Sequence, residues 1–120
     1  MRRSAFPKSR PAADHTANHS AQQKACKQFL EWNGAYVQNN IGGLGVKAGR
    51  PDLEGCLQGA FFAVEVKTGT ARQTEAQKQH QYEIERAGGF YFLVSGPEAL
   101  EMQMIEAGFR LVGTLLSEQR

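Results

Sequence analysis

The sequence predicts one α/β domain, and three observations support this fold class. The chain has 120 residues, 41% hydrophobic and 22% charged, which is typical of an ordinary globular domain. Segments with apolar residues at helical spacing alternate with short runs rich in β-branched and aromatic residues. Asn-Gly and Gly-Gly pairs end the longer helical segments, where helices commonly stop.

The predicted order is helix, three strands, helix, strand and a short helical appendix. In residue ranges, this gives helix 20–34, strand 35–39, loop 41–51, strands 52–57 and 60–68, helix 74–89, strand 90–94, helix 97–108 and a final apolar segment 109–116. Capping boxes are predicted at Ser20 with Gln23 and at Thr74 with Gln77. A Gln58-Gly59 turn joins the second and third strands into a hairpin.

The N-terminal segment differs in charge from the remainder of the chain. Residues 1–20 hold four Lys or Arg against one Asp, whereas residues 21–120 hold ten against eleven acidic residues. We therefore expect a basic disordered tail (1–19) before a domain of residues 20–116. Such a tail is usually solvated, and it can also attract phosphates. His15 and His19 lie at its end, where solvated histidines are commoner than metal ligands.

Several classes of protein are disfavoured by composition. No run of about 18 apolar residues is present, so we expect no membrane span. The charged start is not followed by the apolar run of a secretory signal. Cys26 and Cys56 lack the spacing of a zinc finger, which favours free thiols in a reducing cytoplasm, with one disulfide still compatible.

Charged residues interrupt the apolar strand predicted at 60–68. Side chains alternate along a strand, so Glu65 and Lys67 project from the same face. Asp52 starts the partner strand of the hairpin, which can bring it close to Glu65. Two carboxylates beside a lysine suit a hard cation such as Mg²⁺ or Mn²⁺. The Val66 carbonyl can add a ligand, and Lys67 can orient the attacking water or stabilise transition-state charge.

The pattern also has a purely structural interpretation. Glu65-Val66-Lys67 taken alone is most simply a surface ion pair on a half-exposed strand. The combination with Gly49-Arg50-Pro51-Asp52, separated from Glu65 by twelve intervening residues, is much more specific. Lys47, Arg50 and Arg72 are further candidates, in this case for contacts with DNA phosphates.

These two motifs resemble the signature of the PD-(D/E)XK nuclease superfamily, and their surroundings resemble its VRR-NUC branch. The resemblance covers about residues 20–96. It includes Gln38-Asn39-Asn40 at the end of a strand, the glycine-rich segment 42–49, and Gln77 on the following helix. It implies a restriction-endonuclease-like core of helix, three strands, helix and strand around a mixed central sheet.

The resemblance also implies a chemistry and its residues. It predicts metal-dependent hydrolysis of DNA phosphodiester bonds, with Asp52, Glu65 and the Val66 carbonyl as ligands of Mg²⁺ or Mn²⁺. Lys67 would be the catalytic lysine, and Gln77 would support the site. Short members resemble Holliday-junction resolvases, which implies a homodimer acting on branched DNA in a bacterial or phage-infected host cell.

One departure from the family pattern keeps a second function open. Many relatives carry an acidic residue near the start of the first helix, where this chain has Ser20-Ala21-Gln22-Gln23. A DNA-binding protein with an impaired nuclease site is therefore the alternative. A sequence-specific restriction-type enzyme would need a recognition insert, and none is visible. A structural module with a surface ion pair would bind no metal.

Overall fold

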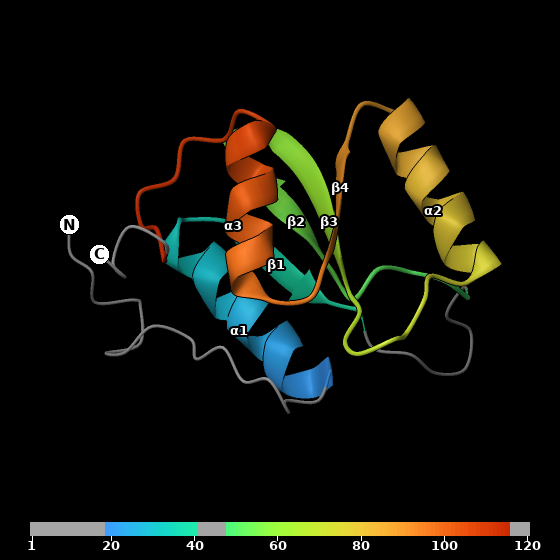
Figure 1. Cartoon of the computed structure of the whole chain (residues 1–120). Coiled ribbons are helices and arrows are strands. Elements are labelled where there is room, and N and C mark those ends of the chain that lie inside the picture. Colours follow the sequence, from blue (N-terminus) through green and yellow to red (C-terminus); the bar gives the residue numbers. More distant parts are fainter. Residues whose placement is uncertain (1–18, 41–47, 116–120) are drawn as a thin grey trace.

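The computed structural model describes residues 19–40 and 48–115. The chain forms three helices and four strands in these ranges (Figure 1). They are α1 (His19–Trp32), β1 (Tyr36–Asn39), β2 (Leu53–Leu57), β3 (Ala60–Val66), α2 (Glu75–Arg86), β4 (Phe90–Val94) and α3 (Pro97–Glu106). The predicted order of elements is confirmed. The tail 1–18 and the glycine-rich residues 41–47 lie outside the described residues.

The four strands form one mixed sheet in the order β1-β2-β3-β4. β1 pairs with β2, and β2 with β3, in antiparallel orientation, whereas β3 and β4 are parallel because α2 connects them. The sheet thus has the α/β architecture and mixed pairing that the sequence and the resemblance predicted. Leu53 pairs with Val64 at the start of β2, so the residue before Leu53 lies next to Glu65.

A tight turn fixes the register of β2 and β3. Gln58 and Gly59 have φ values of 55° and 83°, so both lie in the left-handed region that a two-residue type I′ hairpin requires. The predicted turn is confirmed. This register places the motif residues of the two strands at the same end of the hairpin.

The helices cover both faces of the sheet unequally. α1 and α3 lie on one face, and α2 lies on the other (Figure 1). The main core lies between the sheet and helices α1 and α3, and it contains Cys26, Phe29, Leu30, Phe62, Val64, Val66, Phe92, Leu100 and Met104 among others. None of the α2 residues is buried, so this helix covers its face only partly.

β3 is buried on both faces as a result of this arrangement. Phe62, Val64 and Val66 face the main core, as the alternation in sequence predicted. Ala63 and Glu65 face the α2 side and are also buried. A half-exposed strand, which the surface ion-pair interpretation needs, is therefore not observed.

Three local features differ from or complete the expectation. α1 begins at His19, so Ser20 is its second residue and the predicted capping box there is wrong. The box at Thr74 and Gln77 is confirmed. Residues 109–115 form neither helix nor strand, but they bury Phe109 and Leu115 against the core.

The two cysteines are not joined in a disulfide. Cys26 is buried and Cys56 is exposed, and both are free thiols. Within residues 19–40 and 48–115, no helix combines the length and apolar character needed to span a bilayer.

Gly55 is a site where the fold tolerates no side chain. A Cβ at Gly55 would overlap the carbonyl oxygen of Tyr36 on the neighbouring strand. We expect Gly55→Ala to lower the free energy of unfolding by roughly 3 kcal/mol, because backbone rather than a flexible side chain must move. Gly59→Ala is the control, since a Cβ there meets open space and only its positive φ is unfavourable, at about 1–2 kcal/mol. Urea denaturation of both variants measures this, and equal losses would contradict it.

Candidate active site

Asp52 is held at the entrance of β2 by backbone hydrogen bonds. The Asn40 N–H donates to the Asp52 carbonyl at 2.9 Å, and the Asn40 side chain donates to the Pro51 carbonyl at 2.8 Å. The Asp52 carboxylate accepts the N–H of Val66 at 2.8 Å. Because N–H and C=O of one strand residue point to the same side, the Val66 carbonyl also lies on the Asp52 side of β3. This places three of the predicted site groups together.

Glu65 is the most constrained side chain of the site. It is only 2% exposed, and its Oε2 accepts a hydrogen bond from Gln77 Nε2 at 2.9 Å. Lys67 Nζ lies 3.7 Å from the same oxygen. The other oxygen, Oε1, is buried, and no group among residues 19–40 and 48–115 hydrogen-bonds to it. Burial and the negative charge of Asp52 raise the pKa of Glu65 to about 7, against the opposing effect of Lys67.

Gln77 connects the site to the start of α2. Its amide oxygen accepts the Thr74 N–H at 2.8 Å, and its backbone N–H donates to Thr74 Oγ1 at 3.1 Å. The amide oxygen is thereby occupied, which turns the NH₂ group toward Glu65. The sequence left open whether Gln77 serves the cap or the site, and the geometry shows one side chain making both contacts.

His19 approaches the site although the sequence placed it in the tail. It is the first residue of α1, and its Nε2 lies 3.0 Å from Asp52 Oδ2. An imidazole thus stands beside Asp52 at the helix start where relatives are expected to carry an acid. Gln22 does not take that place, because it is buried against Gly96, where a Cβ would overlap its amide oxygen. A helix start predicted one residue too late concealed His19.

The donor set suits a hard divalent cation that completes its shell with water and phosphate. Asp52, Glu65 and the Val66 carbonyl supply oxygen atoms only, and the unpartnered Glu65 Oε1 is an available ligand. Among the described residues, no group of three or more His, Cys, Asp or Glu side chains is arranged to hold a metal. Mg²⁺ commonly uses one or two carboxylates with substrate phosphates, so the two carboxylates fit that pattern.

Of the three basic side chains predicted to contact DNA phosphates, the structure describes Arg50 and Arg72. Arg50 donates to Asn40 at 2.8 Å and to Glu54 at 3.1 Å, so its guanidinium is engaged within the protein. The same ion pair engages the carboxylate of Glu54. Arg72 is exposed between β3 and α2. Lys47 lies outside the described residues.

Comparisons with known proteins give one solved structure that is similar to this chain. That structure is described as "VRR_NUC domain", with a TM-score of 0.62 and 25% sequence identity. The match covers 76% of this chain and 97% of the other. No protein-family model matches the sequence. No curated protein matches it either. The match to a solved structure confirms the resemblance that the two motifs indicated.

The buried Glu65 predicts a stability that depends on pH. Its pKa of about 7 in the folded protein exceeds its ordinary value of 4.5, so ionisation opposes folding. The contribution of Glu65 to stability is fully present below about pH 4.5 and is lost as pH rises through about 7. Glu65→Gln removes this titration while keeping an oxygen for Gln77. As pH rises from about 5 to about 8.5, we expect the free energy of unfolding of the variant to increase relative to that of the wild type by on the order of 2–3 kcal/mol.

Urea denaturation of metal-free wild type and Glu65→Gln, at about pH 5 and at about pH 8.5, measures this difference in the free energy of unfolding. Mn²⁺ added at the higher pH should stabilise the wild type more than Glu65→Gln, since the cation takes the place of the proton. A stability gap that stays constant with pH would show that Glu65 does not titrate in this range.

Proposed function

The chain has the fold of a VRR-NUC domain, a nuclease fold, and from this we propose that it is a metal-dependent DNA endonuclease that hydrolyses phosphodiester bonds. The observation that supports this most directly is the grouping of Asp52, Glu65 and Lys67 at one end of the β2–β3 hairpin. Burying a carboxylate without full partners is costly for folding. The position of Glu65 in a central strand is therefore better explained by a role in metal binding and catalysis than by a role in folding.

The two carboxylates have fixed and complementary positions. Asp52 is aimed by the Val66 N–H, and Glu65 is aimed by Gln77. We propose that they hold Mg²⁺ or Mn²⁺ together with the Val66 carbonyl. When bound, this cation neutralises phosphate charge and makes water more acidic. These hydrogen bonds from the Val66 N–H and from Gln77 keep both carboxylates oriented before substrate arrives, which lowers the reorganisation needed for the reaction.

Lys67 supplies a positive charge next to the carboxylates. Its ammonium is 3.7 Å from Glu65 Oε2 and its side chain is 21% exposed, so it can reach both the site and a bound phosphate. An ammonium donates hydrogen bonds and cannot accept a proton. We propose that Lys67 orients the attacking water and stabilises the negative charge that develops on the phosphate oxygens.

The finer features of the substrate and assembly remain proposals. We propose branched DNA as the substrate, cut by a homodimer, in the cytoplasm of a bacterial or phage-infected host cell. A domain this small without a recognition insert is suited to backbone and shape readout. Two apolar segments, β4 and α3, are candidates for the dimer interface, but β4 is largely buried and Met104 of α3 is in the core. Met102 and Ile105 on α3 are 54% and 50% exposed, which leaves them as the candidates.

The alternative is a DNA-binding protein with an impaired nuclease site. The contact of His19 with Asp52 favours it, because an imidazole replaces the expected acid and lies where it can hinder a cation. The intact set of Asp52, Glu65 and Lys67 favours the enzyme. The two functions differ in a single measurable property, which is cleavage under conditions where binding is retained.

Cleavage assays separate these functions. Labelled four-way junction, flap, single-stranded and plain duplex DNA are incubated with Mg²⁺ or Mn²⁺, and with EDTA. We expect cutting of branched DNA with either metal and none with EDTA. Glu65→Ala and Lys67→Ala should each reduce the rate by at least about 100-fold, since each removes a group that acts at the phosphate.

Binding of the same DNA by anisotropy is the control for both variants. Cleavage that survives both substitutions would contradict the proposed site. Binding without cleavage by the wild type would support the alternative function. In that case His19→Glu, which restores a carboxylate at the start of α1, is the variant to test for gain of cutting.

The proposed homodimer is tested by light scattering at micromolar concentration. We expect the mass of a dimer for the wild type and of a monomer for Ile105→Glu, because a charge in the centre of an apolar interface is left without solvent. Val112→Glu is a control, since Val112 is 82% exposed and lies outside α3. A monomeric wild type would contradict the dimer without bearing on the nuclease.

A further inference from the structure

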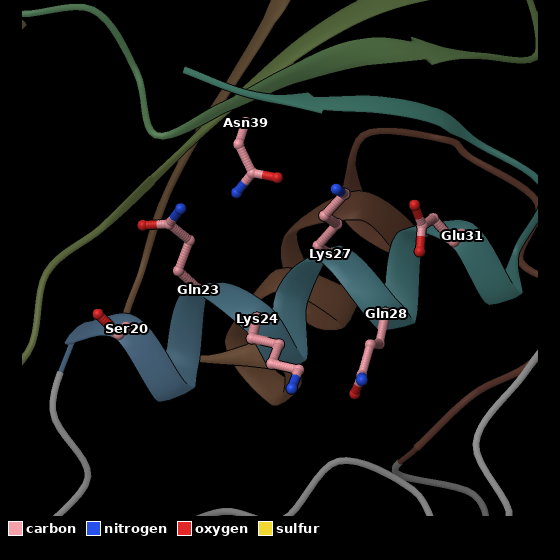
Figure 2. A pocket seen from close by; sticks show the side chains of 7 residues that line it. All are labelled: Ser20, Gln23, Lys24, Lys27, Gln28, Glu31 and Asn39. Atoms are coloured by element: carbon pink, nitrogen blue, oxygen red, sulfur yellow. The ribbon is translucent and has the colours of Figure 1, made fainter. Parts of the chain in front are cut away.

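A polar groove runs along α1 beside the end of β1. It has a volume of about 370 Å³ and is lined by Ser20, Gln23, Lys24, Lys27, Gln28, Glu31 and Asn39 (Figure 2). None of these seven side chains is apolar or aromatic. Six of them lie on the side of α1 that does not pack on the core, where the spacing of three and four residues makes one continuous helix face.

The groove begins at the candidate active site. Ser20 follows His19, whose imidazole contacts Asp52. On the other wall, Asn39 pairs with Leu53, the residue next to Asp52. Both walls therefore start at neighbours of the same carboxylate. A DNA strand with one phosphate at Asp52 and Glu65 can therefore continue from the active site into this groove.

The side chains in the groove suit phosphate groups. Lys24 and Lys27 are cationic, and among the described residues neither has a carboxylate partner. The amides of Gln23 and Asn39 add hydrogen-bond donors, and Figure 2 shows Gln23 and Lys27 projecting from α1 toward the β1 side, where Asn39 lies. Ammonium and amide donors without an aromatic platform fit backbone contacts better than base stacking.

The dimensions of the groove agree with a nucleic-acid strand. From Ser20 to Glu31 there are eleven residue steps, which is about 16 Å along a helix. One strand of duplex DNA rises about 3.4 Å along the duplex axis per nucleotide, so the groove is long enough for at most about four or five phosphates. Glu31 is the only carboxylate among the lining residues and lies at the end remote from Asp52.

We propose that this groove binds the sugar-phosphate backbone of the DNA strand adjacent to the scissile phosphate, with Lys27 as its main cationic contact. The proposal rests on the function proposed above and deepens it. It assigns the strand path to α1 in place of Arg50, whose guanidinium is engaged within the protein. The Glu31 carboxylate repels phosphate and sets the far end of the path.

Charge reversal at matched positions tests the groove. Labelled junction DNA and duplex DNA are titrated with full-length protein carrying Glu65→Gln, in EDTA, so that binding is measured without cutting. Lys27→Glu is compared with Arg110→Glu, which changes net charge equally. Arg110 is exposed, and it contacts Gln58 through its backbone at the hairpin turn, at the opposite end of β2 from Asp52. Circular dichroism checks that both variants are folded.

We expect Lys27→Glu to weaken binding by about tenfold or more, and Arg110→Glu by no more than about threefold. Lys27→Ala should lower the slope of log affinity against log salt by about 0.9 on duplex arms, which corresponds to one lost phosphate contact. Lys27→Arg should keep most of the affinity, because it keeps the charge.

Three results would overturn the groove. Equal weakening by Lys27→Glu and Arg110→Glu would show general attraction rather than a local contact. A parent protein that binds DNA tightly, together with unchanged affinity of Lys27→Glu, would reject the groove and leave the nuclease proposal intact. If the parent protein bound no DNA, the groove would be rejected, and the metal-dependent cleavage assay with the wild type would decide the nuclease proposal separately.

Discussion

The position of one carboxylate, Glu65, governs the rest of the site. It lies in a central strand that is buried on both faces, where an ionised group is expensive to place. Two neighbours offset part of that cost, because Gln77 donates a hydrogen bond and Lys67 supplies opposite charge. Among the described residues, no group hydrogen-bonds to the second oxygen. The raised pKa of Glu65 is the measurable sign that the compensation is incomplete without a cation. A site of this kind lowers the stability of the folded protein and leaves a carboxylate oxygen available to bind a cation.

Most of the fold could be predicted because its signals are local. Turn chemistry at Gln58-Gly59 and the capping box at Thr74 depend on residues adjacent in sequence, and both fix the elements that carry the motifs. The hairpin then brings Asp52 beside Glu65 by register alone. The alternation in β3 predicted the core face correctly. It did not predict that the opposite face is buried as well, since that depends on where α2 packs.

The features that were not predicted depend on contacts between distant segments. His19 reaches Asp52 only because α1 begins one residue earlier and crosses the end of β2, and no local pattern encodes this approach. Arg50 donates to Asn40 after the end of β1 and to Glu54 in β2, and these contacts compete with the phosphate contact assigned to Arg50. The groove requires α1 and the end of β1 to lie side by side. Tertiary placement decides each of these, so sequence periodicity alone was insufficient.

The scarcity of buried residues in α2 has a consequence for motion. Polar contacts tie this helix to the sheet, among them Gln77 with Glu65 and Gln73 with Tyr91. A helix attached in this way has a small local opening free energy compared with the core. The carboxylate that anchors it is also the proposed cation ligand. Occupancy of the site and the docking of α2 are therefore thermodynamically linked, and each favours or opposes the other by the same free energy.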